Sequence, residues 1–165
     1  MVRSQSDIQT IQTLYDKNTN SEIYDSGYQI EIESDFQRGD EETGVWTRMQ
    51  QQSFIDSLIN NYPTGILVFV KDHATATSYQ NPWRVLDGGN RLRAIRDYID
   101  NKFNSMYGTK FEDLSPQDVA KFTTVQIPCQ WMTIERDDPT NTIAEMFTRL
   151  NTSSKPLSQG ELFKA

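Results

Sequence analysis

Cysteine, histidine and long apolar runs are scarce in this sequence of 165 residues. A single cysteine, Cys129, excludes an intrachain disulfide and favours a reducing, intracellular compartment, so we expect a cytoplasmic protein. One histidine, His73, is too few for a histidine-based nuclease centre or a structural zinc site. No apolar run reaches the roughly 18 residues that suggest a membrane span, and the N-terminus has no signal-peptide pattern. We therefore expect a soluble protein without a membrane partner.

Positive charge is also in short supply. The net charge is −7, which argues against a protein that coats nucleic acid nonspecifically, because that affinity comes from a basic surface. The charge is uneven, with eight acids and one arginine in residues 22–42, and four arginines and one acid in residues 84–96. The arginine cluster adjoins two glycines, which makes it the better candidate for contact with an anion or with DNA.

The apolar residues that are present follow two periods. Apolar positions at helical spacing predict helices, and alternation or a short apolar run predicts strands. The expected helices lie at about 6–17, 54–59, 92–103 and 143–150, with a further helix start at 115–118, and the expected strands at 28–32, 66–71, 84–86 and 125–131. This mixture predicts one compact α+β domain with a small mixed sheet flanked by helices.

Three details refine the expected arrangement. The first helix is expected to begin at Ser6. Pro128 argues for an edge position of its strand, because proline cannot donate to a sheet. Ser158 and Glu161 form a capping-box pattern near the end of the sequence, which suggests a domain from a longer chain. We expect residues 1–27 to be a lead-in with a helix, and residues 28–165 to be the main domain.

The stretch RVLDGGNRLRAI, residues 84–95, is the main candidate for chemistry. It predicts a strand, a glycine turn and then a helix N-terminus, whose free amides and positive dipole end suit an anion. Arg91 and Arg93 could add donors to phosphate oxygens, and Asp87 could hold a metal or a water. The alternative is a plain strand-to-helix turn with surface arginines, and local physics alone does not separate the two.

Other polar residues carry weaker signals. Gln37 and Arg38 have the form of ordinary loop residues, and Asn151 that of a helix C-cap. Cys129 falls on the apolar face of its expected strand, which predicts a core residue rather than a nucleophile.

Several of these segments together resemble one protein family. The sequence from about residue 28 onward is similar to the N-terminal ParB/sulfiredoxin-like domain of the GmrSD type of modification-dependent restriction enzymes. The segments that carry the resemblance are FQR at 36–38, Trp46, FIDSLI ahead of YPTG, ILVF, VLDGGNRLRAI, and FTRLNTSSKPLSQGEL at 147–162.

The resemblance implies a nucleoside-triphosphate-binding and hydrolysing domain that controls or carries out DNA cleavage in a restriction or anti-phage system, with Mg²⁺ as a further cofactor. It implies catalytic roles for Asp87, Arg91, Gln37 and Arg38, and cofactor binding by Gly88, Gly89, Asn90, Arg93 and Asn151. Its metal ligands stay unknown. The sequence departs from the family pattern at Gly89 and Asn90, where two glutamines are usual.

Two other functions stay open. One is a ParB-like DNA nuclease or nickase that acts without a nucleotide, and the other is a noncatalytic nucleotide- or DNA-binding module. The partners expected are thus a nucleotide, DNA bound by the arginine cluster or by a linked nuclease domain, and a second copy of the chain.

Overall fold

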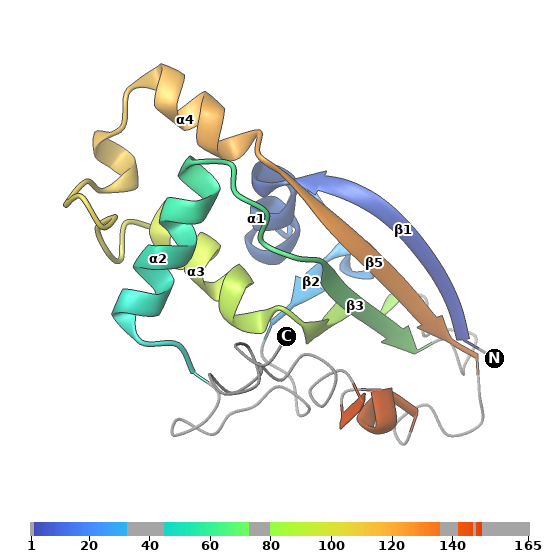
Figure 1. The fold of residues 1–165 in the computed structure, drawn as a ribbon. Helices are drawn as coiled ribbons and strands as arrows, with labels where there is room; N and C mark the ends of the chain where they lie inside the picture. Colours follow the sequence, from blue (N-terminus) through green and yellow to red (C-terminus); the bar gives the residue numbers. More distant parts are fainter. Residues whose placement is uncertain (1, 33–44, 73–79, 136–141, 147, 150–165) are drawn as a thin grey trace, which may run out of the picture.

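A five-stranded mixed sheet with helices packed on it forms the fold (Figure 1). The computed structural model describes residues 2–32, 45–72, 80–135, 142–146 and 148–149. The strand order is β1-β5-β3-β4-β2, with β1–β5 and β3–β4 antiparallel and β5–β3 and β4–β2 parallel. The strands are β1 Val2–Thr10, β2 Ile30–Glu31, β3 Leu67–Asp72, β4 Trp83–Asp87 and β5 Gln126–Ile134. The expected α+β class is confirmed.

The helices begin at side-chain caps or at glycine. Thr47 and Gln50 form a capping box at the start of α2, and Ser115 caps α4 with Pro116 in its first turn. The α-helices are α1 Ile11–Thr19, α2 Arg48–Ile59, α3 Gly89–Ile99 and α4 Pro116–Thr123, and the short 3₁₀ helices are η1 Ser26–Tyr28 and η3 Phe111–Asp113. Residues 142–146 and 148–149 are also helical.

The sheet separates two apolar cores. On one face, Leu67, Phe69 and Val85 pack with residues of the four α-helices, including the fully buried Tyr98. On the other face, Val68, Val70 and Leu86 pack with Ile143. Both faces of β3 are therefore buried, which explains why its sequence is apolar at successive positions. No helix in the described ranges is both long and apolar enough to cross a bilayer.

The expected start of the first helix at Ser6 is wrong. Residues 2–10 form β1, which pairs with β5 along its whole length, from Val2 opposite Ile134 to Thr10 opposite Gln126. The helix begins at Ile11, and the Thr10 side chain accepts a hydrogen bond from the Thr13 amide as its N-cap. The pairing of β1 with the distant strand β5 therefore outweighs the local helical spacing of Ile8 and Ile11.

The expected edge position of the strand that contains Pro128 is also wrong, because β5 lies between β1 and β3. The pairs between β3 and β5 begin at Leu67 opposite Cys129, one residue beyond the proline. Pro128 therefore lies where β5 has only β1 beside it, opposite Ile8. The strand behaves locally as an edge at this position, and it becomes interior at the next residue.

The remaining expected elements agree with the structure in their main part. The helices α2 and α4 and the strands β3 and β4 are confirmed, and α3 is confirmed except at its end, which lies at Ile99 rather than at residue 103. The strand expected at 28–32 is reduced to Ile30–Glu31, because Tyr28 ends a 3₁₀ helix and is 63% exposed. The capping-box pattern at Ser158 and Glu161 lies outside the described residues.

Two isoleucines near the N-terminus differ in burial, which predicts different effects when their side chains are shortened to alanine. Ile11 is fully buried whereas Ile8 is 62% exposed. We expect Ile11→Ala to lower the free energy of unfolding by about 2–5 kcal/mol through the cavity it leaves, and Ile8→Ala to change it by less than about 0.5 kcal/mol. Urea unfolding of both variants checks this. Equal effects would mean that residues 2–10 form the helix expected from their apolar spacing.

Candidate functional site

The glycine turn between β4 and α3 is built around a position where a side chain does not fit. Gly88 has φ 113° and ψ 16°, a left-handed conformation that favours glycine. A Cβ atom at Gly88 would lie 2.3 Å from Cδ2 of Leu67 in β3. The next residue, Gly89, is buried as the first residue of α3. The turn thus brings bare backbone against the start of the neighbouring strand.

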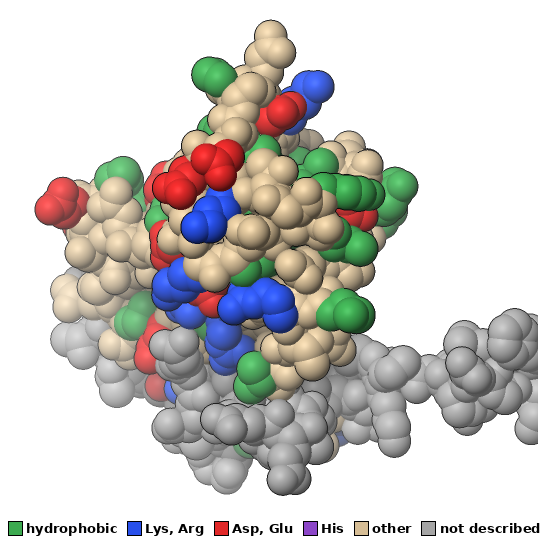
Figure 2. All heavy atoms as spheres, turned by 90° about the vertical axis from the view of Figure 1, so that its left-hand side faces the viewer, with side chains coloured by type: hydrophobic (Ala, Val, Ile, Leu, Met, Phe, Trp, Pro, Cys, Tyr) green, Lys and Arg blue, Asp and Glu red, His purple; other side chains and the backbone are tan. Residues whose placement is uncertain are grey.

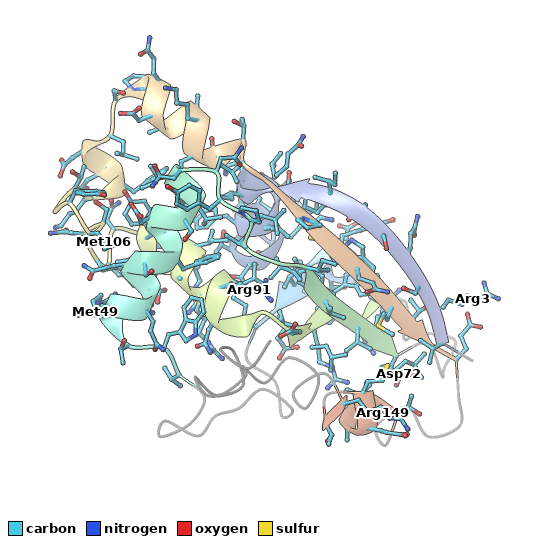
Figure 3. All side chains as sticks on the ribbon, in the orientation of Figure 1. Arg3, Met49, Asp72, Arg91, Met106 and Arg149 are labelled. Atoms are coloured by element: carbon cyan, nitrogen blue, oxygen red, sulfur yellow. The ribbon has the colours of Figure 1, made fainter. Side chains whose placement is uncertain are left out.

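Arg91 is directed into the protein from the first turn of α3, toward the start of β3 (Figure 3). Its Nη1 donates to the Thr64 carbonyl at 2.8 Å, and its Nη2 donates to the Ile66 carbonyl at 3.1 Å. Its Nη2 also lies 3.7 Å from Oδ2 of Asp87. Burial lowers the pKa of the guanidinium, and the Asp87 charge acts in the opposite direction. Arginine nevertheless stays protonated. The Arg91 guanidinium therefore places a buried positive charge between the turn and the start of β3.

Two glycines make room for this guanidinium. A Cβ atom at Gly65, which has φ 85°, would lie 3.2 Å from Nη1 of Arg91, and one at Gly88 would lie 3.2 Å from Nη2. Arg91 therefore joins the loop before β3 to the start of α3. The structure brings together the YPTG and DGGNR segments, which the sequence predicted only as separate parts of one family pattern.

Asn90 connects the same turn to the start of α2. Its side-chain oxygen accepts a hydrogen bond from the Trp46 amide at 3.2 Å and one from Arg93 Nη1 at 3.4 Å. The Trp46 ring packs edge-on against Phe54 of α2 at a centroid distance of 5.5 Å. The short Asn90 amide thus has a defined place in the structure, at a position where the family pattern usually has glutamine.

The glycine turn has the features of an anion-binding site. The first amides of a helix have no intrahelical acceptor, and Gly88 offers no side chain to cap them. The first intrahelical bond of α3 runs from the Leu92 amide to the Gly88 carbonyl at 3.0 Å. The carboxylate of Asp87, at the end of β4, is 38% exposed and thus accessible to a ligand. A phosphate at this turn would meet backbone donors, the positive helix end and an adjacent carboxylate.

The described residues contain no group of three or more His, Cys, Asp or Glu side chains that could hold a metal. Mg²⁺ at this turn would take ligands from the Asp87 carboxylate together with phosphate oxygens and water. Magnesium in nucleotide sites is commonly held in this way, by one or two carboxylates together with the phosphates.

The four arginines of residues 84–96 do not form one cluster. Arg84 lies in the middle of β4, between Glu31 of β2 and Val70 of β3, and Arg91 is directed inward. Asp97 of α3 lies close to two basic side chains, with its Oδ1 3.2 Å from Nε of Arg96 and 3.6 Å from Nζ of Lys102, which follows the helix.

Basic side chains from two helices share one face of the molecule. The Arg48 guanidinium of α2 lies 4.6 Å from the ring centroid of Phe103, the neighbour of Lys102. Figure 2 shows basic side chains gathered on this side of the molecule. We call the set of Arg48, Arg96 and Lys102, which these contacts bring near one another, the α2–α3 basic surface.

Cys129 is a core residue, as its alternating strand predicted. It is 1% exposed, and its thiol donates to the Ile127 carbonyl at 3.4 Å. Burial, with the nearby Asp7 charge, raises the pKa of the thiol to about 12, so the nucleophilic thiolate is disfavoured. Three further residues of the implied site, Gln37, Arg38 and Asn151, lie outside the described residues, as does His73.

Sequence reasoning missed two features. The carbonyls of Thr64 and Ile66 hold Arg91, and no side-chain pattern marks a backbone acceptor. Lys71 is 5% exposed at the end of the apolar strand β3. A lysine continuing an otherwise apolar buried strand was a readable signal, because lysine is rarely buried without a specific environment.

Comparison with known proteins places these features in a family. The family model for the GmrSD restriction endonuclease, N-terminal domain, matches residues 11–165. No curated protein and no solved structure matches the chain. The resemblance of the sequence to the GmrSD type is thereby confirmed, whereas the ParB/sulfiredoxin-like fold stays a prediction.

The contact between Gly88 and Leu67 predicts a large cost for any side chain in the turn. We expect Gly88→Ala to lower the free energy of unfolding by about 2–5 kcal/mol, from left-handed strain and overpacking together. Gly108→Ala is the matched control, because Gly108 has φ 82° and open space around it, so only about 1–2 kcal/mol of strain applies. Thermal or urea unfolding measures both variants. A Gly88 variant no less stable than the Gly108 variant would contradict the close approach.

Proposed function

Because the chain belongs to the family of the GmrSD restriction endonuclease N-terminal domain, we propose that it binds and hydrolyses a nucleoside triphosphate and thereby controls DNA cleavage in a restriction system. The family supports the role in restriction or phage defence. The observation that carries the nucleotide part is the glycine turn, where β4 passes through Gly88 into the N-terminus of α3.

Each part of the turn has a role in this proposal. Gly88, Gly89 and the first amides of α3 cradle the phosphates, and Asp87 orients a water or binds Mg²⁺. Arg93 neutralises phosphate charge from its place beside Asn90. Phosphoryl transfer depends on positioned donors and charge stabilisation more than on covalent chemistry by the protein, and this site offers such donors.

Arg91 acts in two ways in the proposal. Its hydrogen bonds to Thr64 and Ile66 hold the turn in place. Its charge, buried beside Asp87, raises the positive potential at the phosphate site, since charges act over longer distances where water is excluded. Gln37, Arg38 and Asn151, which lie outside the described residues, would complete the pocket.

A second candidate function is a binding module without turnover. The engagement of both terminal nitrogens of Arg91 with backbone carbonyls favours it, because a catalytic arginine needs donors that reach the transferred phosphate. Phosphate release separates the two candidates, since both bind a nucleotide and only the first consumes it. The α2–α3 basic surface is the proposed place of DNA contact in either case.

The decisive experiment is calorimetric titration with each of the four ribonucleoside triphosphates in the presence of Mg²⁺, together with a phosphate-release assay. We expect Arg93→Gln to weaken binding roughly 10- to 100-fold, the worth of a hydrogen bond to a charged group. Lys121→Gln on α4 is the control, because it removes the same charge from an exposed position. Binding of none of the four nucleotides, or equal loss in both variants, would refute the proposed phosphate site.

A further inference from the structure

Two adjoining cavities lie at the end of β4 that is opposite to the glycine turn. The first, of about 660 Å³, is lined by Lys71 and Gly27 among others, and the second, of about 540 Å³, by Lys17 and Trp131 among others. Trp83 and Tyr28 line both cavities. Each volume falls in the range of small-ligand sites. The four-residue step along β4 from Trp83 to Asp87 separates this place from the glycine turn by roughly 13 Å.

Aromatic rings supported by the core form part of the lining, which is otherwise mainly polar and includes the carboxylates of Asp7 and Asp25. The rings of Trp83 and Trp131 meet edge-on at a centroid distance of 5.0 Å, and the Trp131 ring stacks on Phe69 at 4.3 Å. Trp131 also donates from Nε1 to Oδ1 of Asp7 at 2.6 Å. These contacts fix the orientation of the two indole rings. Tyr28, by contrast, is 63% exposed at the rim.

Two lysines place positive charge beside these rings. Lys71 Nζ lies 4.6 Å from the ring centroid of Trp83, and Lys17 Nζ lies 4.9 Å from that of Trp131. Lys71 also donates to the Gly27 carbonyl. Burial lowers the pKa of both lysines. Burial, together with the Lys17 charge, lowers the pKa of Lys71 to about 8. The Asp7 charge raises the Lys17 pKa in opposition to burial, and a bound anion would act on both lysines in the same direction.

We propose that the joined cavities, which we call the Trp83 pocket, bind a nucleotide through its planar base and its phosphate. The base packs against Tyr28 and Trp83, and the phosphate pairs with Lys17 and Lys71. Aromatic faces next to positive charge are the common means by which proteins bind single nucleotides and single strands, because every base has a π-face and carries a phosphate. The source is either a free nucleotide or a nucleotide of a DNA strand, and the two share this chemistry.

Tyr28 gives the cleanest test because it is exposed. The assay is fluorescence anisotropy of a short 5′-fluorescein-labelled oligothymidylate, with unlabelled dTMP as competitor. We expect Tyr28→Ala to weaken binding roughly tenfold, the worth of one stacked base, and Tyr28→Phe to keep it. Tyr107→Ala, at a position 79% exposed in another loop, is the matched control and should bind as the original protein does.

Charge is tested separately with Lys17→Met, which keeps most of the side-chain volume. We expect weaker binding and a salt dependence reduced by about one phosphate contact. Competition by dTMP at an affinity close to that of the oligonucleotide assigns the pocket to free nucleotides. Binding of the oligonucleotide alone, weakened by Tyr28→Ala, assigns it to a DNA strand, because a strand held only on the α2–α3 basic surface would bind equally with and without Tyr28. Either outcome supports the pocket.

Two results would overturn the Trp83 pocket. They are absence of binding of both probes up to millimolar concentration, and equal binding by the Tyr28→Ala, Lys17→Met and unaltered proteins. Failure here is distinguishable from failure at the glycine turn, because Arg93→Gln tests triphosphate binding at the turn, whereas Tyr28→Ala tests oligonucleotide binding at the Trp83 pocket. If Tyr28→Ala abolished triphosphate binding while Arg93→Gln did not, the triphosphate site would be the Trp83 pocket instead.

Discussion

The close approach of Leu67 to the backbone of Gly88 is the constraint on which this arrangement depends. Leu67 begins β3, opposite Cys129 of β5, and its side chain occupies the space where a Cβ atom of residue 88 would lie. On the other side of the turn, Arg91 donates to the carbonyls of Thr64 and Ile66, just before β3. The start of β3 is therefore connected to the turn twice, by the Leu67 side chain and by Arg91, and a ligand at the turn would contact backbone that both contacts hold in place.

The elements that could be predicted from sequence are those whose signals are local. The helices α2 and α4 begin at capping side chains, and α3 begins at a glycine, so their positions follow from short segments. The strand β1 and the interior place of β5 could not be predicted, because they depend on a pairing between residues more than a hundred positions apart. Local apolar spacing carried no information about that partner.

The candidate site shows the same limit at the level of side chains. The sequence identified the glycine turn and its arginines, but not that they point in different directions. Arg91 and Arg93 are two residues apart on a helix, which separates them by roughly 200° around its axis. One is thus directed into the protein, where it holds Thr64 and Ile66, and the other lies beside Asn90. Helix geometry predicts the separation, but only the packing of α3 shows which arginine is buried.

The pairing of β1 with β5 also affects how the protein forms during synthesis. Val2 pairs with Ile134 and Thr10 with Gln126, so β1 leaves the ribosome long before its partner strand exists. Contacts between distant residues form late and slow folding, because the connecting chain must first be ordered. Six of the nine residues of β1, VRSQSDIQT, are exposed. Its mainly polar side chains suit a segment that stays in water until its partner strand is made. Its hydrophilic composition limits unwanted association of the nascent chain until β5 arrives.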